Sequence, residues 1–244
     1  MTLLSRRVLS RAKTLDFLVE LEKMSGDEAW SLYLPPGLPQ SEEVPEQMKI
    51  FPEIVELARN SKTGAVLFWS SEHKYLVLPP FPVTARTTTQ GILIEPLHSM
   101  LKHNYRIALV LVRLGAYAIG IGDSENLANS KVGTGLVHGR HKKGGSSQAR
   151  FRRHREKQIE SFLIRVCRHA REQLEPQATT LDYIVYGGAR TTIQLLQKQC
   201  PFLEKLNIPA LPPLLEIPEP RQAVLSTAIS RVWSSTVVEW QEDY

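Results

Sequence analysis

Residues 105–121 read YRIALVLVRLGAYAIGI, and they decide the architecture of the second half of the chain. Two apolar runs, Tyr105 to Leu114 and Ala116 to Ile121, are separated by Gly115 alone. Short apolar runs joined by a glycine are typical of neighbouring buried β-strands. Residues Asn126 to Val137 predict a third, more polar strand, so the three together predict an antiparallel meander.

Beyond the meander the pattern changes to helices and single strands. Apolar residues recur at helical spacing from Ile159 to Leu174, which predicts an amphipathic helix. The elements expected to follow are a strand at Leu181 to Tyr186, a helix at Ala189 to Lys198, a short strand at Leu214 to Ile217 and a final helix at Arg221 to Trp240. This order predicts an α/β (α+β) fold in which helices pack on a mixed sheet.

The first hundred residues predict a separate, smaller α/β unit. Its expected elements are helices at Ser5 to Met24 and Glu42 to Asn60, a short strand at Ala29 to Leu34, and a hairpin made by Gly64 to Ser70 and Lys74 to Leu78. A Thr-rich connector, Thr84 to Thr89, precedes the change of pattern. We therefore expect one domain at residues 1–98, whose role the sequence does not reveal, and a second at residues 99–244.

The two cysteines and the hydropathy pattern exclude several classes of protein. Cys167 and Cys200 form no CxxC motif, so the sequence predicts buried thiols and neither a zinc site nor a disulfide framework. The longest purely aliphatic run, Ile107 to Val112, is far shorter than the roughly 20 residues of a membrane span. Residues Met1 to Ala12 carry three arginines but no apolar region typical of a signal peptide, so a cytoplasmic protein without a membrane partner is expected.

Positive charge is concentrated in one segment, residues 138–157. This segment holds eight Lys or Arg and one acid, Glu156, and so carries +7, whereas the whole chain carries +5 and the other 224 residues −2. A local cluster on a nearly neutral protein is typical of a surface that binds a polyanion, most plausibly nucleic acid. A solvated helix face is the alternative interpretation of the same run of charge.

A glycine-rich loop with a glutamine, at residues 138–150, lies inside this basic segment. Gly144 and Gly145 allow the backbone to approach a substrate closely. Gln148 does not titrate near neutral pH, so it is unsuited to act as a general base. Its side-chain amide can orient a water molecule while its backbone N–H stabilises an oxyanion. An ordinary flexible connector is the alternative interpretation.

The arrangement from Tyr105 to Trp240 resembles the middle, catalytic domain of the eukaryotic and archaeal class 1 peptide release factors. Its most specific part is residues 131–157, KVGTGLVHGRHKKGGSSQARFRRHREK. The resemblance is closer to the bacterial relatives of that family and to the Vms-type ribosome-rescue peptidyl-tRNA hydrolases. In those hydrolases a Gly-x-x-Gln motif replaces the release factors' Gly-Gly-Gln, and Gly145 to Gln148 fits that motif.

This resemblance implies an RNase H-like fold and hydrolysis of the ester of peptidyl-tRNA in the large ribosomal subunit, without a cofactor. It implies that Gln148 places the attacking water and that Gly144 and Gly145 shape the loop. The implied partners are the ribosome, peptidyl-tRNA and ribosomal RNA; no protein partner is indicated. The cationic side chains expected to hold RNA phosphates are Arg140, Lys142, Lys143, Arg150, Arg152, Arg153, Arg155 and Lys157.

Other chemistries remain alternatives on the sequence alone. A two-metal nuclease needs clustered carboxylates, yet residues Tyr105 to Ile121 contain no Asp or Glu, and Asp123, Glu125 and Asp182 are scattered. His138, His141 and His154 are candidate phosphate contacts, or an acid and base for metal-independent cleavage of the tRNA 3′ end. His138 and His141 form an HxxH, but no further ligand is nearby, so no metal site is predicted. A ribosome-binding or tRNA-binding factor without catalysis is the third alternative.

Overall fold

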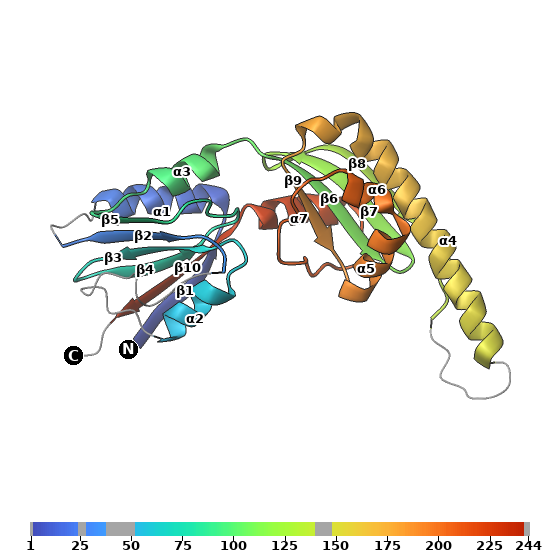
Figure 1. Ribbon diagram of the computed structural model, residues 1–244, viewed down its shortest axis with the longest axis horizontal. Helices are drawn as coiled ribbons and strands as arrows, with labels where there is room; N and C mark the ends of the chain where they lie inside the picture. The colour runs from blue at the N-terminus through green and yellow to red at the C-terminus, as the bar shows by residue number, and fades with distance from the viewer. Residues whose placement is uncertain (1, 24–27, 38–51, 140–147, 242–244) are drawn as a thin grey trace. The chain divides into compact units, whose positions relative to one another are not determined.

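The computed structural model describes residues 2–23, 28–37, 52–139 and 148–241, which belong to two compact units. Unit 1 comprises Met1–His103 and Ser230–Tyr244, and unit 2 comprises Asn104–Ile229. This division differs from the expected one, in which the second domain began at residue 99 and continued to residue 244. The last strand, β10 (Ser235–Gln241), belongs to unit 1 because it pairs with two strands of that unit (Figure 1).

Unit 1 is built on a six-stranded antiparallel sheet in the order β1-β10-β4-β3-β2-β5. Its other strands are β1 (Thr2–Leu9), β2 (Trp30–Leu34), β3 (Ala65–Trp69), β4 (Lys74–Leu78) and β5 (Thr87–Gln90). Its helices are α1 (Arg11–Lys23), α2 (Pro52–Asn60) and α3 (Glu95–Lys102). The expected hairpin is confirmed as β3 and β4. The helix expected from Glu42 is described only from Pro52, since residues 38–51 lie outside the described part.

Helices cover both faces of this sheet. Leu18 and Leu21 of α1 and Leu97 of α3 pack on one face, where Phe68 and Val77 are fully buried. Helix α2 covers the opposite face in the same way (Figure 1). Unit 1 therefore has three layers, with the sheet in the middle.

Two expected helices are wrong at the end that borders β1 or β10. Residues 2–9 form β1 and not the start of a helix from Ser5, and the last expected helix ends at Val232, before β10. In β10 the side chains alternate between two cores, because Val237 packs on the α1 face and Val238 on the α2 face. This period of two, together with β-branched residues, stabilises a strand once a partner is available, and β1 is that partner.

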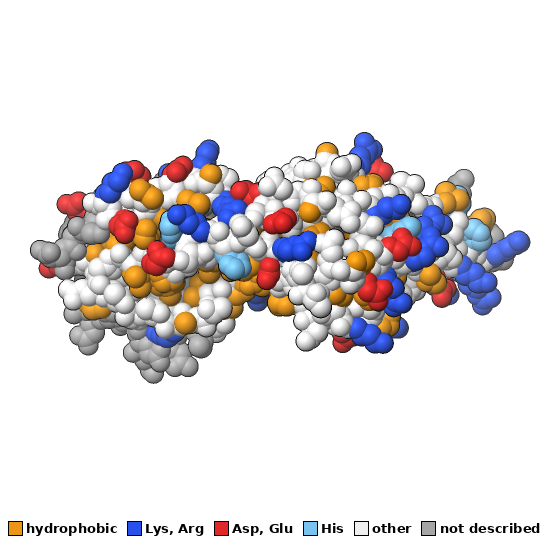
Figure 2. Space-filling view, turned by 90° about the horizontal axis from the view of Figure 1, so that it is seen from above, with side chains coloured by type: hydrophobic (Ala, Val, Ile, Leu, Met, Phe, Trp, Pro, Cys, Tyr) orange, Lys and Arg blue, Asp and Glu red, His pale blue; other side chains and the backbone are white. Residues whose placement is uncertain are grey.

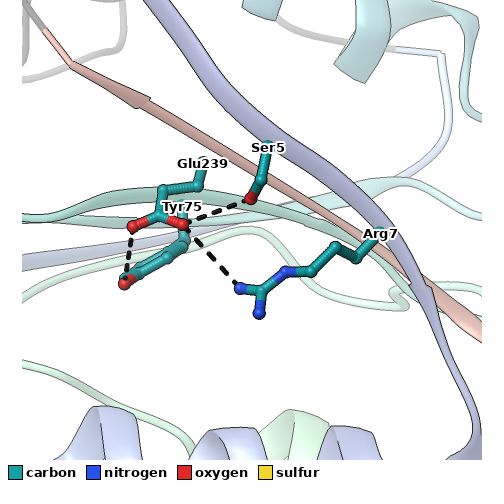
Figure 3. Close-up of polar contacts among 4 residues, drawn as sticks. All are labelled: Ser5, Arg7, Tyr75 and Glu239. Atoms are coloured by element: carbon teal, nitrogen blue, oxygen red, sulfur yellow. Dashed lines mark hydrogen bonds and ion pairs between the residues drawn. The ribbon is translucent and has the colours of Figure 1, made fainter.

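A polar network joins three strands on the α1 side of the sheet (Figure 3). The Glu239 carboxylate accepts hydrogen bonds of 3.2 Å from the hydroxyls of Ser5 and Tyr75, and it lies 3.8 Å from the Arg7 guanidinium. Burial raises the pKa of Tyr75 above its ordinary value, and the Glu239 carboxylate raises it further. Tyr75 therefore stays a neutral donor, and the half-buried carboxylate is satisfied from both neighbouring strands.

Unit 2 is built on a four-stranded mixed sheet in the order β8-β7-β6-β9. The strands β6 (Arg106–Arg113), β7 (Ala116–Asp123) and β8 (Asn126–Thr134) form the expected antiparallel meander, and β9 (Tyr183–Gly187) lies parallel to β6. Its helices are α4 (Gln148–Leu174), the 3-10 helix η2 (Glu175–Thr180), α5 (Arg190–Gln199), α6 (Pro201–Lys205) and most of α7 (Gln222–Val232). The expected mixed sheet with packed helices is confirmed.

The faces of this sheet carry different helices. Helices α4, α5 and α6 share one core with the β6 side chains Ala108, Val110 and Val112. Helix α7 lies on the opposite face and approaches β7 closely, since a Cβ on Gly122 would lie 2.2 Å from Ile229. The strand expected at Leu214 to Ile217 is wrong, because only an isolated bridge joins Leu215 to Gly187. No helix within the described residues is long and apolar enough to cross a lipid bilayer.

The two cysteines form a disulfide, which corrects the expectation of buried thiols. Cys167 lies in the second half of α4 and Cys200 at the junction of α5 and α6, with their Cα atoms 5.4 Å apart. Their separation of 33 residues carries no motif, so the sequence gives no sign of the pairing. The pairing follows from the packing of α5 and α6 against α4, which brings the two residues together.

Reduction of the disulfide should lower the free energy of unfolding by about 2–4 kcal/mol, because the bond closes a loop of 33 residues in the unfolded chain. Thermal unfolding with and without dithiothreitol measures this difference. The variant Cys167→Ser should melt at the temperature of the reduced wild-type protein in both conditions. Two free thiols in the oxidised protein, or an unfolding temperature insensitive to reductant, would contradict the prediction.

Candidate nucleic-acid interface

Helix α4 is the longest element of unit 2, and only its second half packs on the sheet. Its 27 residues correspond to a length of about 40 Å. The first buried side chain is Phe162, and Leu163, Val166, Ala170 and Leu174 continue the buried stripe. The first turns, residues 149–154, are exposed, and in Figure 1 this yellow end of α4 extends past the sheet of unit 2.

The sequence of α4 explains why a helix forms without support from a core at its start. Residues 148–174 contain no Gly or Pro, and Gln, Ala, Arg, Glu and Lys, all favourable in helices, supply most of its first turns. Glu175 and Pro176 follow Leu174, and a proline disfavours continuation of an α-helix at this point.

The glutamine of the Gly-x-x-Gln motif lies at the start of a helix. Gln148 is the first residue of α4, so Gln148 and Arg150 belong to the helix rather than to the loop expected over residues 138–150. The first backbone N–H groups of a helix have no partner within it, and the helix dipole makes this end positive. The first turn of α4 contains no acidic residue, so its own side chains do not offset this charge.

Five of the predicted RNA-binding cations lie in the described part of α4. Arg150, Arg152 and Arg153 are exposed, as is Lys157, whereas Arg155 is half-buried. Arg152 lies 3.7 Å from Glu156, but both side chains are more than 60% exposed, and such a pair contributes little. Figure 2 shows Lys and Arg side chains gathered around α4. Most of these cations are therefore free to contact a phosphate.

The chain between β8 and the loop is tied to α4. The Arg165 guanidinium donates to the Thr134 carbonyl at 3.1 Å. The His138 backbone N–H donates to the Gln158 side chain at 3.1 Å, and Arg155 donates to the His138 carbonyl at 2.9 Å. These contacts hold residues 134–138 against α4. This role of Gln158 and Arg165 was not predicted, because side chains that bond to the main chain leave no pattern in the sequence.

The structure brings together two of the three candidate histidines. The rings of His138 and His154 lie 6.4 Å apart between centroids. The remaining predicted site residues, namely Arg140, His141, Lys142, Lys143, Gly144 and Gly145, lie outside the described residues.

The carboxylates of unit 2 considered as possible metal ligands lie at the ends of strands. Asp182 accepts a hydrogen bond of 2.7 Å from the backbone N–H of Arg106, so it joins β6 to the start of β9. Asp123 is exposed at the end of β7. In the described ranges of the chain, no group of three or more His, Cys, Asp or Glu is placed to hold a metal ion.

Charge differs between the two units. Unit 2 contains 18 Lys and Arg against 10 Asp and Glu, whereas unit 1 contains 12 against 15. Unit 2 therefore has a net charge of +8 and unit 1 of −3. Because a polyanion is attracted by clustered positive charge, electrostatics favour unit 2 as the unit that contacts nucleic acid.

Comparison with known proteins identifies relatives of the chain. Residues 105–238 match the model of the Actinobacteria/chloroflexi VLRF1 release factor family. Peptide chain release factor subunit 1 of Aeropyrum pernix is 25% identical over 206 residues, which cover 71% of this chain and 55% of the relative. The Thermococcus sibiricus protein of the same name is 29% identical over 122 residues, 48% of this chain and 29% of the relative. The chain thus spans about half, or less, of these relatives' length.

Solved structures of translation factors are also similar. An archaeal translation termination factor, aRF1, aligns with 92% of this chain and 73% of its own, at 18% identity and a TM-score of 0.40. Dom34 of S. cerevisiae, described as a translation termination-like factor, aligns with 93% of this chain and 66% of its own, at 8% identity and a TM-score of 0.32.

Replacement of Arg152 and Arg153 by Ala should weaken RNA binding and reduce the slope of log K against log salt by about 1.4–1.8, since each phosphate contact contributes about 0.7–0.9. Titration of labelled tRNA at several salt concentrations measures the slope. The control removes the same charge from α5, by Arg190→Ala with Lys198→Ala, and should leave the slope unchanged. Equal effects of the two double variants would mean that α4 is not the interface.

Proposed function

The chain belongs to the Actinobacteria/chloroflexi VLRF1 release factor family, and from this membership we propose that it is a cytoplasmic translation-rescue factor that hydrolyses peptidyl-tRNA on the ribosome or its large subunit. One observation carries the proposal: Gln148 begins an exposed, cationic helix end and directly follows Gly145-Ser146-Ser147. In this proposal unit 2 is the catalytic unit, and the role of unit 1 is left open.

The proposed reaction is attack of water on the ester that joins the peptide to the tRNA 3′ end. The water oxygen bonds to the carbonyl carbon and the bond to the ribose oxygen breaks. One proton of the water goes to the ribose oxygen and the other is released to solvent, so the products are a free peptide carboxylate and a tRNA 3′ hydroxyl. An ester needs a well-positioned water more than a strong base, so orientation and charge stabilisation can supply much of the acceleration.

Each group of the site has a distinct role in this mechanism. The Gln148 side-chain amide holds the water, and its backbone N–H, which has no acceptor within α4, stabilises the developing oxyanion. Gly144 and Gly145 let the backbone approach the ester closely. The cations of the loop and of α4 hold RNA phosphates, and no cofactor or metal takes part. Large-subunit RNA and the tRNA itself complete the site.

Replacement of Gln148 by Ala should slow peptide release by about 10²–10³-fold, the usual cost of losing one group that stabilises the transition state. The assay follows peptide released from stalled peptidyl-tRNA on isolated large subunits under single-turnover conditions. Gln194→Ala on α5 is the matched control and should release peptide at the wild-type rate. Unchanged binding of Gln148→Ala to the subunits separates chemistry from docking. If wild type binds but releases nothing, the protein is a binding factor and the enzymatic proposal fails.

The proximity of His138 and His154 supports a second candidate, metal-independent cleavage near the tRNA 3′ end. Two imidazoles can share the roles of base and acid in transfer of a phosphodiester to a neighbouring 2′ hydroxyl. In that case His154→Gln should lower formation of a shortened tRNA at least 10²-fold, as measured on a sequencing gel with 5′-labelled tRNA. Full-length tRNA in the wild-type reaction would exclude this activity.

A further inference from the structure

A cleft lies beside α4, next to the residues that follow β8. Its volume is about 320 Å³, and its walls include Leu136, His154, Lys157, Ser161 and Arg165. Small-molecule sites have volumes of about 300–1,000 Å³, so this cleft has room for a ligand no larger than about one nucleotide.

The floor and outer wall of the cleft are held in place. Phe162 forms the floor and is 2% exposed. A Cβ on Gly135 would lie 2.7 Å from the Phe162 ring, so the chain that forms the outer wall lies directly against it. The contacts of Thr134 with Arg165 and of His138 with Gln158 tie both ends of that wall to α4. The cleft is therefore built before any ligand arrives.

The walls are positive and carry no acid. His154, Lys157, Ser161 and Arg165 follow one another at intervals of three and four residues, so they form one stripe along α4. Glu156 and Glu160 lie on the other side of the helix by the same periodicity. Arg165 uses one of its five N–H donors for Thr134 and retains others for a ligand. An anion is the complementary occupant.

An apolar side chain stands at the rim of this positive cleft. Leu136 is 72% exposed, and a bare phosphate would gain nothing from it. A nucleotide has a phosphate for the cations and a ribose or base that can cover an apolar group. The cleft is too small for a paired helix, which favours an unpaired nucleotide.

We propose that this cleft binds one unpaired nucleotide of RNA, with its phosphate at Lys157 and Arg165 and its sugar or base against Leu136. The proposal rests on the RNA-binding part of the function proposed above. Lys157 lies nine residues after Gln148, which corresponds to about 14 Å along α4. The bound nucleotide is therefore not the one that carries the ester. It comes either from the tRNA, upstream of the terminal residue, or from ribosomal RNA.

A charge placed in the wall tests the cleft without breaking its contacts. Ser161 is exposed and lines the cleft, so Ser161→Glu puts a carboxylate beside the expected phosphate. Ser161→Gln introduces a side chain of the same size as glutamate but without the charge. At about 0.1 M salt we expect Ser161→Glu to bind RNA about tenfold more weakly and with a smaller salt slope, and Ser161→Gln to bind within twofold of wild type. Equal affinities for the two variants would overturn the proposal.

Two RNA targets identify the source of the nucleotide. Loss of affinity for deacylated tRNA alone in solution assigns it to the tRNA, whereas loss seen only with large ribosomal subunits assigns it to ribosomal RNA. Leu136→Ser provides a second test, since it should weaken the same complex severalfold and leave the salt slope unchanged. If Leu136→Ser binds the RNA with wild-type affinity, the sugar or base does not contact Leu136, and the proposal that the cleft binds a nucleotide is wrong.

These measurements are independent of peptide release. If the wild-type protein releases no peptide but the Ser161 variants differ in RNA affinity as expected, the proposed hydrolysis is wrong and the proposed nucleotide site is supported. If release is observed but the two Ser161 variants bind RNA equally well, the proposed nucleotide site is wrong and the proposed hydrolysis is supported.

Discussion

The packing of the second half of α4 on the sheet of unit 2 is the constraint on which the candidate interface depends. Five side chains of α4 are buried in the core formed with β6 and β7, namely Phe162, Leu163, Val166, Ala170 and Leu174. Burial of such side chains is worth about 1.5–3 kcal/mol each for the larger ones. Only because this half is anchored can the first turns extend past the sheet and present their cations without a core of their own.

The contacts at the end of β8 complement that anchor. Hydrogen bonds from Arg155, Gln158 and Arg165 hold residues 134–138 against α4, so the two ends of the glycine-containing segment are attached to the same helix. In this arrangement the basic side chains have two functions. Arg165 and Arg155 maintain the local structure through main-chain carbonyls, while Arg150, Arg152 and Arg153 remain exposed to solvent. The positive charge at the start of α4 therefore depends both on the packing of the second half of the helix and on the exposed cations of its first turns.

Most elements of unit 2 were predictable because their patterns are local. The meander has apolar runs separated by a glycine, and α4 has an apolar stripe of helical period. Strands β1 and β10 were not predictable, because each depends on a partner more than 200 residues away in the chain. Val8 of β1 fits the helical spacing of Leu15 and Leu18 in α1 by coincidence, and only the pairing with β10 selects the strand. The disulfide between Cys167 and Cys200 also depends on a tertiary contact.

The residue types of the candidate site were predictable from the sequence, but the start of its helix and the contacts that hold it were not. The excess of cations over residues 138–157 and the Gly-x-x-Gln pattern are visible in the sequence. The start of α4 at Gln148 and the contacts of Gln158 depend on three-dimensional packing. The segregation of charge into unit 2 requires knowledge of the division of the chain, because residues 230–244 contribute their acids to unit 1.

The position of β10 in the sheet of unit 1 has a consequence for folding during synthesis. This strand lies between β1 and β4, so the sheet has a gap until residue 241 has left the ribosome. All strands of unit 2 precede it, and that unit can fold while β1 still lacks a partner. During that interval the unpaired edges of β1 and β4 are exposed to other chains, and unpaired edges favour aggregation. The sheet of unit 1 is then completed only when β10, which is synthesised late, inserts between two strands that are synthesised early.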